Sequence, residues 1–170
     1  MNILFILLVI FLLIFIVWIS SVFFGAPFQP SSDKALREII ELSEIKKSNK
    51  SQKVADLGSG NGKIVIEFAK QGMEAHGFEI NPILVWTSRI KIKKLGLENK
   101  AFIHRKNFWK QDFSDFDIVT SFQINYVMPR LEEKLKKELR SGAKIISNTW
   151  QFPNWKPKKK LEDIYLYEKV

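Results

Sequence analysis

Hydrophobic and polar positions divide the chain into two parts with different patterns. Residues 3–24 are apolar throughout, apart from two serines near the end of the run. The rest of the chain alternates short apolar runs, typical of buried strands, with stretches whose apolar residues recur every three or four positions, typical of helices. The pattern predicts an N-terminal apolar segment at residues 1–24, a linker at 25–32 and a folded domain at 33–170.

The apolar segment is long enough to cross a membrane. A helix of the 22 residues from 3 to 24 exceeds the roughly 30 Å hydrocarbon core of a bilayer, because a helix rises about 1.5 Å per residue. A cleaved secretory signal is the alternative, since small residues follow the run; no Lys or Arg precedes it, which favours an uncleaved transmembrane helix. Lys34 and Arg37 follow closely, so the positive-inside tendency predicts a single-pass membrane protein with a cytoplasmic domain.

Strands and helices are predicted to alternate in the folded domain. Ser32 or Asp33 can cap a first helix, and Asn81-Pro82 starts another, because Asn caps a helix and Pro has no N–H to leave unpaired. Strands are predicted at residues 53–57, 74–79, 101–104, 117–122, 144–147 and 163–167, and helices at 33–45, 63–71, 82–95 and 128–140. Repeated βα units imply an α/β fold with a mostly parallel sheet covered by helices on both faces.

A glycine-rich turn follows the first predicted strand. Gly58, Gly60 and Gly62 stand between that strand and the next helix. Glycine is needed where a ligand approaches the backbone so closely that a Cβ would collide, and the unpaired N–H groups of the helix start face such a ligand. Glu79 ends the next strand, where a carboxylate can accept hydrogen bonds from ribose hydroxyls. The pattern predicts a nucleotide-like cofactor, whereas a purely structural turn with a salt-bridged Glu79 is the alternative.

The details of the turn favour S-adenosylmethionine over NAD. The dinucleotide fingerprint is Gly-x-Gly-x-x-Gly, and Lys63 stands where the third Gly is required. Asp56 ends the strand before the turn, where its charge fits poorly beside a pyrophosphate. The same carboxylate fits well beside the positively charged methionine end of S-adenosylmethionine.

These motifs resemble those of class I S-adenosylmethionine-dependent methyltransferases, which have a Rossmann-like fold. Residues 54–62 are similar to their motif I, and residues 77–82 to their second motif. The chain resembles in particular the membrane-anchored lysine N-methyltransferases of the ATP synthase c subunit and the adenine nucleotide translocase, with their prokaryotic relatives. That resemblance rests on residues 27–31 (Pro-Phe-Gln-Pro-Ser), 107–109 (Asn-Phe-Trp) and 154–157 (Asn-Trp-Lys-Pro).

The resemblance implies roles for individual residues around the cofactor. The turn would line the methionine and ribose portions, Glu79 would hold the ribose hydroxyls, and Ile80 would pack on the adenine. Asn107 and the backbone of Phe108 would read the adenine edge, although many class I enzymes have Asp at that position. The predicted cofactor-binding set is Asp56, Gly58, Ser59, Gly60, Gly62, Glu79, Ile80, Asn107 and Phe108.

The acceptor side of the site is less well defined by the sequence. A lysine acceptor has a pKa near 10.4 and must lose a proton, which a partly apolar channel favours. Phe122, Tyr126, Trp150 and Trp155 are candidates for its walls, with core or lid packing as the alternative for each. Gln123, Asn125 and Tyr126 are candidates to hydrogen-bond the amine. Residues 122–125 depart from the aromatic-Leu-x-Pro pattern of the family.

The predicted function is therefore methylation of a lysine in a membrane protein at the cytoplasmic surface. Three alternatives remain: a lipid or small-molecule methyltransferase, an RNA methyltransferase, and a non-catalytic module that binds the cofactor. With no Cys and only His76 and His104, a metal site is not expected, and both histidines are predicted to be packing or surface residues.

The basic charge of the chain has two interpretations. The net charge of +9 arises entirely after residue 32 and suits nucleic acid or anionic lipid, or simply a solvated surface. The cluster Lys156, Lys158, Lys159 and Lys160 could contact lipid headgroups or an acidic face of a membrane protein, or form a solvated loop. Among these partners, a lipid bilayer is expected and a nucleic acid is not.

Overall fold

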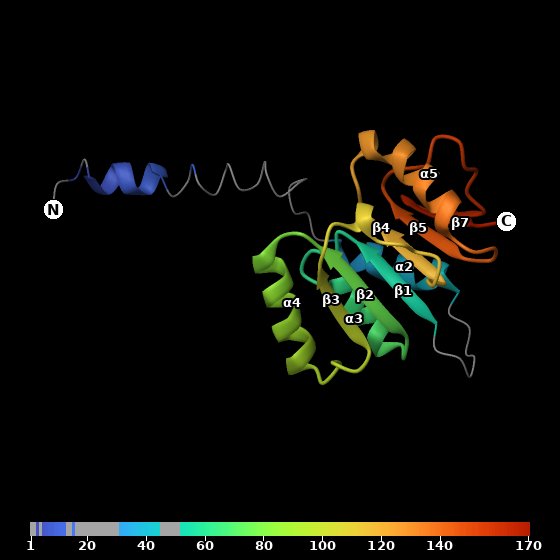
Figure 1. Ribbon diagram of the computed structural model, residues 1–170, viewed down its shortest axis with the longest axis horizontal. Helices are drawn as coiled ribbons and strands as arrows, with labels where there is room; N and C mark the ends of the chain where they lie inside the picture. Colours follow the sequence, from blue (N-terminus) through green and yellow to red (C-terminus); the bar gives the residue numbers. More distant parts are fainter. Residues whose placement is uncertain (1–2, 4, 13–14, 16–30, 45–51) are drawn as a thin grey trace.

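The computed structural model describes residues 3, 5–12, 15, 31–44 and 52–170 (Figure 1). The predicted transmembrane segment and linker lie largely outside these residues, as does most of the predicted loop at 46–52. Among the described residues, none forms a helix that is both long and apolar enough for a membrane span. The predicted boundaries of the N-terminal segment and the linker therefore stay predictions.

A seven-stranded sheet forms the centre of the domain, in the order β3-β2-β1-β4-β5-β7-β6. The first five strands are parallel, and β7 runs antiparallel to both β5 and β6. The predicted, mostly parallel α/β sheet is thus confirmed. The strand bounds are β1 Lys53–Leu57, β2 Glu74–Glu79, β3 Ala101–Arg105, β4 Ile118–Ser121, β5 Lys144–Asn148, β6 Lys159–Leu161 and β7 Ile164–Glu168.

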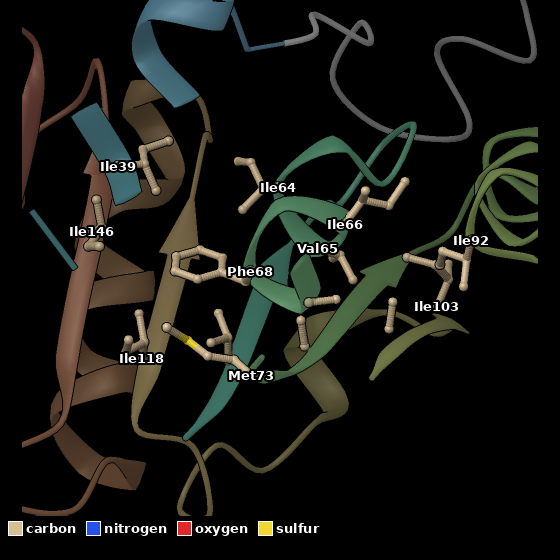
Figure 2. Packing of buried hydrophobic residues seen from close by; sticks show 14 of the residues in the cluster. Ile39, Ile64, Val65, Ile66, Phe68, Met73, Ile92, Ile103, Ile118 and Ile146 are labelled. Atoms are coloured by element: carbon tan, nitrogen blue, oxygen red, sulfur yellow. The ribbon is translucent and has the colours of Figure 1, made fainter. Parts of the chain in front are cut away.

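Helices cover both faces of the sheet, and strand residues alternate between the two cores. On one face, α2 (Asp33–Ser43), α3 (Lys63–Lys70) and α4 (Pro82–Lys94) pack on Val54, Ile118 and their neighbours. Figure 2 shows Ile39, Phe68 and Ile92 of these helices gathered around that core. On the other face lies α5 (Met128–Glu138), and two 3-10 turns, η1 (Phe108–Lys110) and η2 (Asn125–Val127), flank the neighbouring strand ends.

The predicted helix starts are confirmed by their caps. Ser32 Oγ accepts from the Ala35 N–H at 3.1 Å, and Asn81 Oδ1 accepts from the Ile83 and Leu84 N–H groups at 3.0 and 3.4 Å. The predicted end of α5 was too late, because the helix stops at Glu138 and Leu139 is extended, although its side chain is still buried. The sequence pattern also missed β6, because its Lys-Lys-Leu sequence has no strand signature.

Candidate functional site

A crevice site is expected where β1 and β4 lie side by side, because their connections leave in opposite directions. After β1 the chain enters α3 on one face, and after β4 it continues through η2 to α5 on the other. Ligands of open α/β sheets bind at such a switch point, outside the carboxyl ends of the strands. The glycine turn after β1 and the segment after β4 therefore meet at the place where a cofactor is expected.

The glycine turn has the geometry that requires glycine. Gly58 has φ of +73°, and a Cβ there would lie 2.9 Å from Gln123 Nε2. Gly62 has φ of +75°, and its Cβ would lie 3.0 Å from the Ser88 Cβ. The turn is fastened to β2, because the Gly58 and Ser59 N–H groups donate to the Phe78 carbonyl at 2.9 and 3.2 Å. Gly58 is exposed, so a ligand at the carboxyl ends of the strands can reach its backbone.

Glu79 joins the turn to the end of β2. One carboxylate oxygen accepts from the Gly60 N–H at 2.9 Å, and the other accepts from the Ile80 and Asn81 N–H groups at 2.8 Å each. The side chain is buried, and it forms no ion pair with any residue that the structure describes. Among the described residues, the alternative in which Glu79 forms a salt bridge is therefore not observed. A carboxylate has about four acceptor positions, so one is left for a ligand hydroxyl.

Asp56 is a buried carboxylate with one hydroxyl partner. Its Oδ1 accepts from Thr120 Oγ1 at 2.7 Å, and the residue is only 4% exposed. Burial raises the pKa of Asp56 to about 7, and the charge of Glu79 raises it further, although the Thr120 hydrogen bond favours the ionised form. Thr120 was missed by sequence reasoning, because only the pairing of β1 with β4 brings it opposite Asp56. A cationic ligand group in the crevice would stabilise the ionised carboxylate.

Two serines near the crevice keep hydroxyls without a partner among the described residues. Ser121 Oγ, at the end of β4, and Ser59 Oγ are both buried and unpaired. A Cβ on Gly77 would lie 2.5 Å from Ser59 Oγ, so this hydroxyl points at β2 and away from the open side of the turn. Ser59 can therefore line the cofactor only with its backbone, whereas Ser121 was not predicted as a site residue.

The three candidate amine-binding residues differ in their contacts and in their exposure. Gln123 Nε2 donates to the Leu57 carbonyl at 2.8 Å, which places this side chain across the ends of β1 and β4. Asn125 and Tyr126 lie in η2 and are exposed, Tyr126 to 79%. Among the candidate aromatic walls, Trp155 packs on Phe152 and Tyr167 of the core, as the packing alternative predicted. Of the three, Gln123 is therefore the one whose side chain is bonded to the end of β1.

The predicted adenine-binding residues gather at the ends of β2 and β3. Asn107 Oδ1 accepts from the Trp109 N–H at 3.0 Å and caps η1, which leaves the Asn107 amide N–H₂ as a donor. The Lys106 N–H donates to the Glu79 carbonyl at 3.1 Å, so this segment is joined to the end of β2. Ile80 and Phe108 are both half-buried at this edge.

Lys63, which breaks the dinucleotide fingerprint, has a structural partner that the sequence did not reveal. Its Nζ donates to the Ser31 carbonyl at 2.8 Å and pairs with Asp33 Oδ1 at 2.7 Å. Asn148, at the end of β5, lies 3.5 Å from Ser31 Oγ through its Nδ2. The chain just before α2 is thereby attached beside the glycine turn. In the sequence, the only indication of this contact is a Lys directly after the third glycine.

The two histidines form a packed pair. His76 Nδ1 lies 2.9 Å from His104 Nε2, and His76 Nε2 lies 2.9 Å from Glu74 Oε1. Their rings stack on each other and on Phe102 and Phe78, as a packing role predicts. Within the described part of the chain, no group of three or more His, Cys, Asp or Glu side chains could hold a metal ion.

Comparisons with known proteins agree with this geometry. The family described as the ANTKMT methyltransferase domain matches residues 56–159. The lysine N-methyltransferase of the ATP synthase c subunit from Mus musculus is 36% identical over 131 residues, 77% of this chain and 51% of that protein. A protein-lysine N-methyltransferase of Saccharolobus islandicus is 33% identical over 151 residues, covering 83% of this chain and 92% of that protein. The chain thus spans about half the length of the mouse relative and nearly all of the archaeal one.

A solved structure matches the fold over a similar range. The RNA methyltransferase of Salinibacter ruber, in complex with S-adenosyl-L-homocysteine, has a TM-score of 0.75 at 26% identity. The match covers 83% of this chain and 92% of that one.

Proposed function

We propose, because this chain belongs to the ANTKMT methyltransferase domain family, that it transfers a methyl group from S-adenosylmethionine to the Nζ of a lysine. The observation that carries the proposal is the pair of carboxylates, Asp56 and Glu79, on either side of the glycine turn. Among the residues that the structure describes, Asp56 is buried without a cation, and Glu79 keeps one acceptor position free. These are the complements of a ligand with an ammonium at one end and ribose hydroxyls at the other.

The residues present fit such a cofactor. Asp56 would face its ammonium, the backbone of Gly58 and Gly60 would lie against it, and Glu79 would accept from the ribose. The Asn107 amide would donate to the adenine edge. When bound, the cofactor supplies an activated methyl group on a sulfonium. The chain then needs to position the acceptor in line and to exclude water, which are the main contributions to such a displacement.

The acceptor amine must be neutral when it attacks. Gln123 lies where β1 and β4 end, and its amide oxygen accepts no hydrogen bond from the described residues, so it can accept one from the amine. Half-buried Phe122 precedes it and provides an apolar wall, which lowers the pKa of a lysine ammonium by desolvation. The proton leaves to solvent before transfer.

We further propose that the lysine belongs to a membrane protein and is methylated at the cytoplasmic surface. The apolar run at residues 3–24 supports this, because it would keep the domain close to a bilayer. The name of the mouse relative supports it too, since that protein acts on a subunit of ATP synthase.

The test is transfer of a labelled methyl group to membranes from a strain lacking the gene. The full chain and labelled S-adenosylmethionine are incubated with those membranes, and the protein, lipid and RNA fractions are separated. We expect label in protein, on methylated lysine by mass spectrometry. Label confined to lipid or RNA would overturn the lysine acceptor, and binding without transfer to any fraction would indicate a non-catalytic module.

A further inference from the structure

The positive charge of the chain is concentrated along one edge of the sheet. Residues 80–111, which contain α4, β3 and η1, include eight Lys or Arg and a single acid, Glu98. This segment therefore carries a net +7 of the total +9. Figure 1 shows α4 beside β3, at the end of the sheet opposite to β7.

The cations of this segment have no acidic partners within the described part of the domain. None of the eight is in an ion pair with a residue that the structure describes. Arg89 is held in place, because its Nε and Nη2 both donate to the Ile103 carbonyl at 3.1 and 2.7 Å, yet no carboxylate among the described residues neutralises it. The charge along this edge is therefore not neutralised by any acid that the structure describes.

Large apolar side chains accompany the charge on the same surface. Val85, Ser88 and Ile92 turn one face of α4 toward the core. The opposite face carries Ile83, 69% exposed, and Trp86, 65% exposed, one turn apart. Lys93 and Lys94 follow on that face two turns later and are also exposed. We name Ile83, Trp86, Lys93 and Lys94 the α4 surface.

We propose that the α4 surface docks on an anionic phospholipid bilayer. Exposed Trp and Ile side chains can insert among the acyl chains, while neighbouring lysines contact anionic headgroups. Trp is also favoured at the membrane interface. A nucleic acid would use the cations but offers no apolar phase for Ile83. The charge and the two apolar residues together therefore favour a lipid surface.

This docking fixes the orientation of the site. Helix α4 begins at Pro82, three residues after Glu79, so its N-terminal turn and the cofactor-binding ends of the strands lie at the same side of the domain. With Ile83 at the bilayer, the crevice opens close to the membrane surface. The acceptor lysine would then lie near the level of the lipid headgroups.

The test places a polarity-sensitive fluorophore on the α4 surface. The chain contains no cysteine, so Ile83→Cys in the full chain gives a single labelling site, and Ser141→Cys after α5 gives a matched control site. Both labelled chains are added to phosphatidylcholine vesicles with and without phosphatidylglycerol. We expect a blue shift at position 83 that grows with phosphatidylglycerol and weakens with salt, and none at position 141.

Charge reversals then distinguish binding through the α4 surface from a general electrostatic attraction of the whole chain to the vesicles. In the Ile83→Cys chain, Lys93→Glu with Lys94→Glu should lower the apparent affinity for phosphatidylglycerol vesicles at least about tenfold. Lys137→Glu with Lys169→Glu changes the net charge equally and should stay within about twofold, since Lys137 lies on α5 and Lys169 follows β7. Thermal melts by circular dichroism verify that each variant is folded.

Three outcomes would overturn the docking proposal. They are equal shifts at positions 83 and 141, equal losses for the two charge reversals, or a shift with RNA but none with anionic vesicles. No methyl transfer occurs in these measurements, so their result is independent of the proposed acceptor.

Discussion

The crevice and the junction between α2 and the C-terminal strands each hold a carboxylate, in opposite environments. In the crevice, burial raises the pKa of Asp56 to about 7, and its polar partner is a single hydroxyl. At the junction, hydrogen bonds from Lys159 and Lys144 lower the pKa of Glu44 to about 2. Glu44 has its cations within the fold. Asp56 has no cation among the described residues, and a ligand can supply one. A buried carboxylate without a neighbouring cation therefore marks the functional region.

The two lysine-rich regions differ in the same way. In the cluster at residues 156–160, Lys158 pairs with Glu168, Lys159 pairs with Glu44, and Lys160 lies over the Tyr165 ring. Lys159 and Lys160 belong to a strand, β6, and not to a loop, although both are exposed as the solvated interpretation predicted. The cations of α4 have no such partners among the described residues. Lysine density in a sequence therefore does not indicate which charges are available to a partner.

The largest expected effect is on the crevice carboxylate. Because the folded-state pKa of Asp56 is about 7 against an ordinary 3.8, the folded protein loses stability as pH rises between these values. Asp56→Asn removes this loss and should stabilise the ligand-free chain at pH 8, by on the order of 3–4 kcal/mol. The gain should vanish near pH 4. Urea unfolding at both pH values measures it, and an equal gain at both would contradict the assignment.

The second expected effect concerns the buried cation of the junction. Lys144 Nζ donates to the Ser43 carbonyl at 2.9 Å and to Glu44 Oε2 at 3.0 Å, at the end of α2. Lys144→Met should lower the free energy of unfolding by about 2–3 kcal/mol, because the last carbonyls of α2 lose their donor. Affinity for S-adenosylmethionine should not change. A variant as stable as the wild type in urea would show that the junction contributes little.

The third effect tests the other crevice carboxylate. Glu79→Ala leaves the ribose hydroxyls and the Gly60 N–H without their acceptor, and should weaken binding of S-adenosylmethionine by roughly 1–3 kcal/mol. Isothermal calorimetry measures the affinity, with Glu74→Ala, at the far end of the same strand, as the control. Unchanged affinity for Glu79→Ala would remove this residue from the site.

The smallest effect is expected for Glu44. Its folded-state pKa is depressed from 4.5 to about 2, so its contribution is present above pH 4.5 and is lost as pH falls toward 2. Glu44→Gln should cost less than about 1 kcal/mol at pH 7, because the side chain is partly exposed and solvent screens it. The difference from wild type should disappear near pH 2. A difference that persists there would mean that packing, not charge, is responsible.

The sequence predicts those parts of the fold whose signals are local. The predicted bounds of β1 and β2 match the structure, and the starts of α2 and α4 follow from Ser32 and Asn81, because a cap acts within three residues. The turn is likewise recognisable from its glycines. The partners of Asp56, Lys63 and Glu44 are not, since Thr120, Ser31 and Lys159 reach them only through strand order and loop packing.

The edge strand β6 has a consequence for how copies of this protein behave when concentrated. An exposed strand edge presents unpaired N–H and C=O groups on which a second sheet can grow. Here the outermost strand is only three residues long, and two of them are lysines. Short length and repeated positive charge are the features that discourage strand addition between molecules. The same lysines that complete the domain thus discourage self-association through the β6 edge of the sheet.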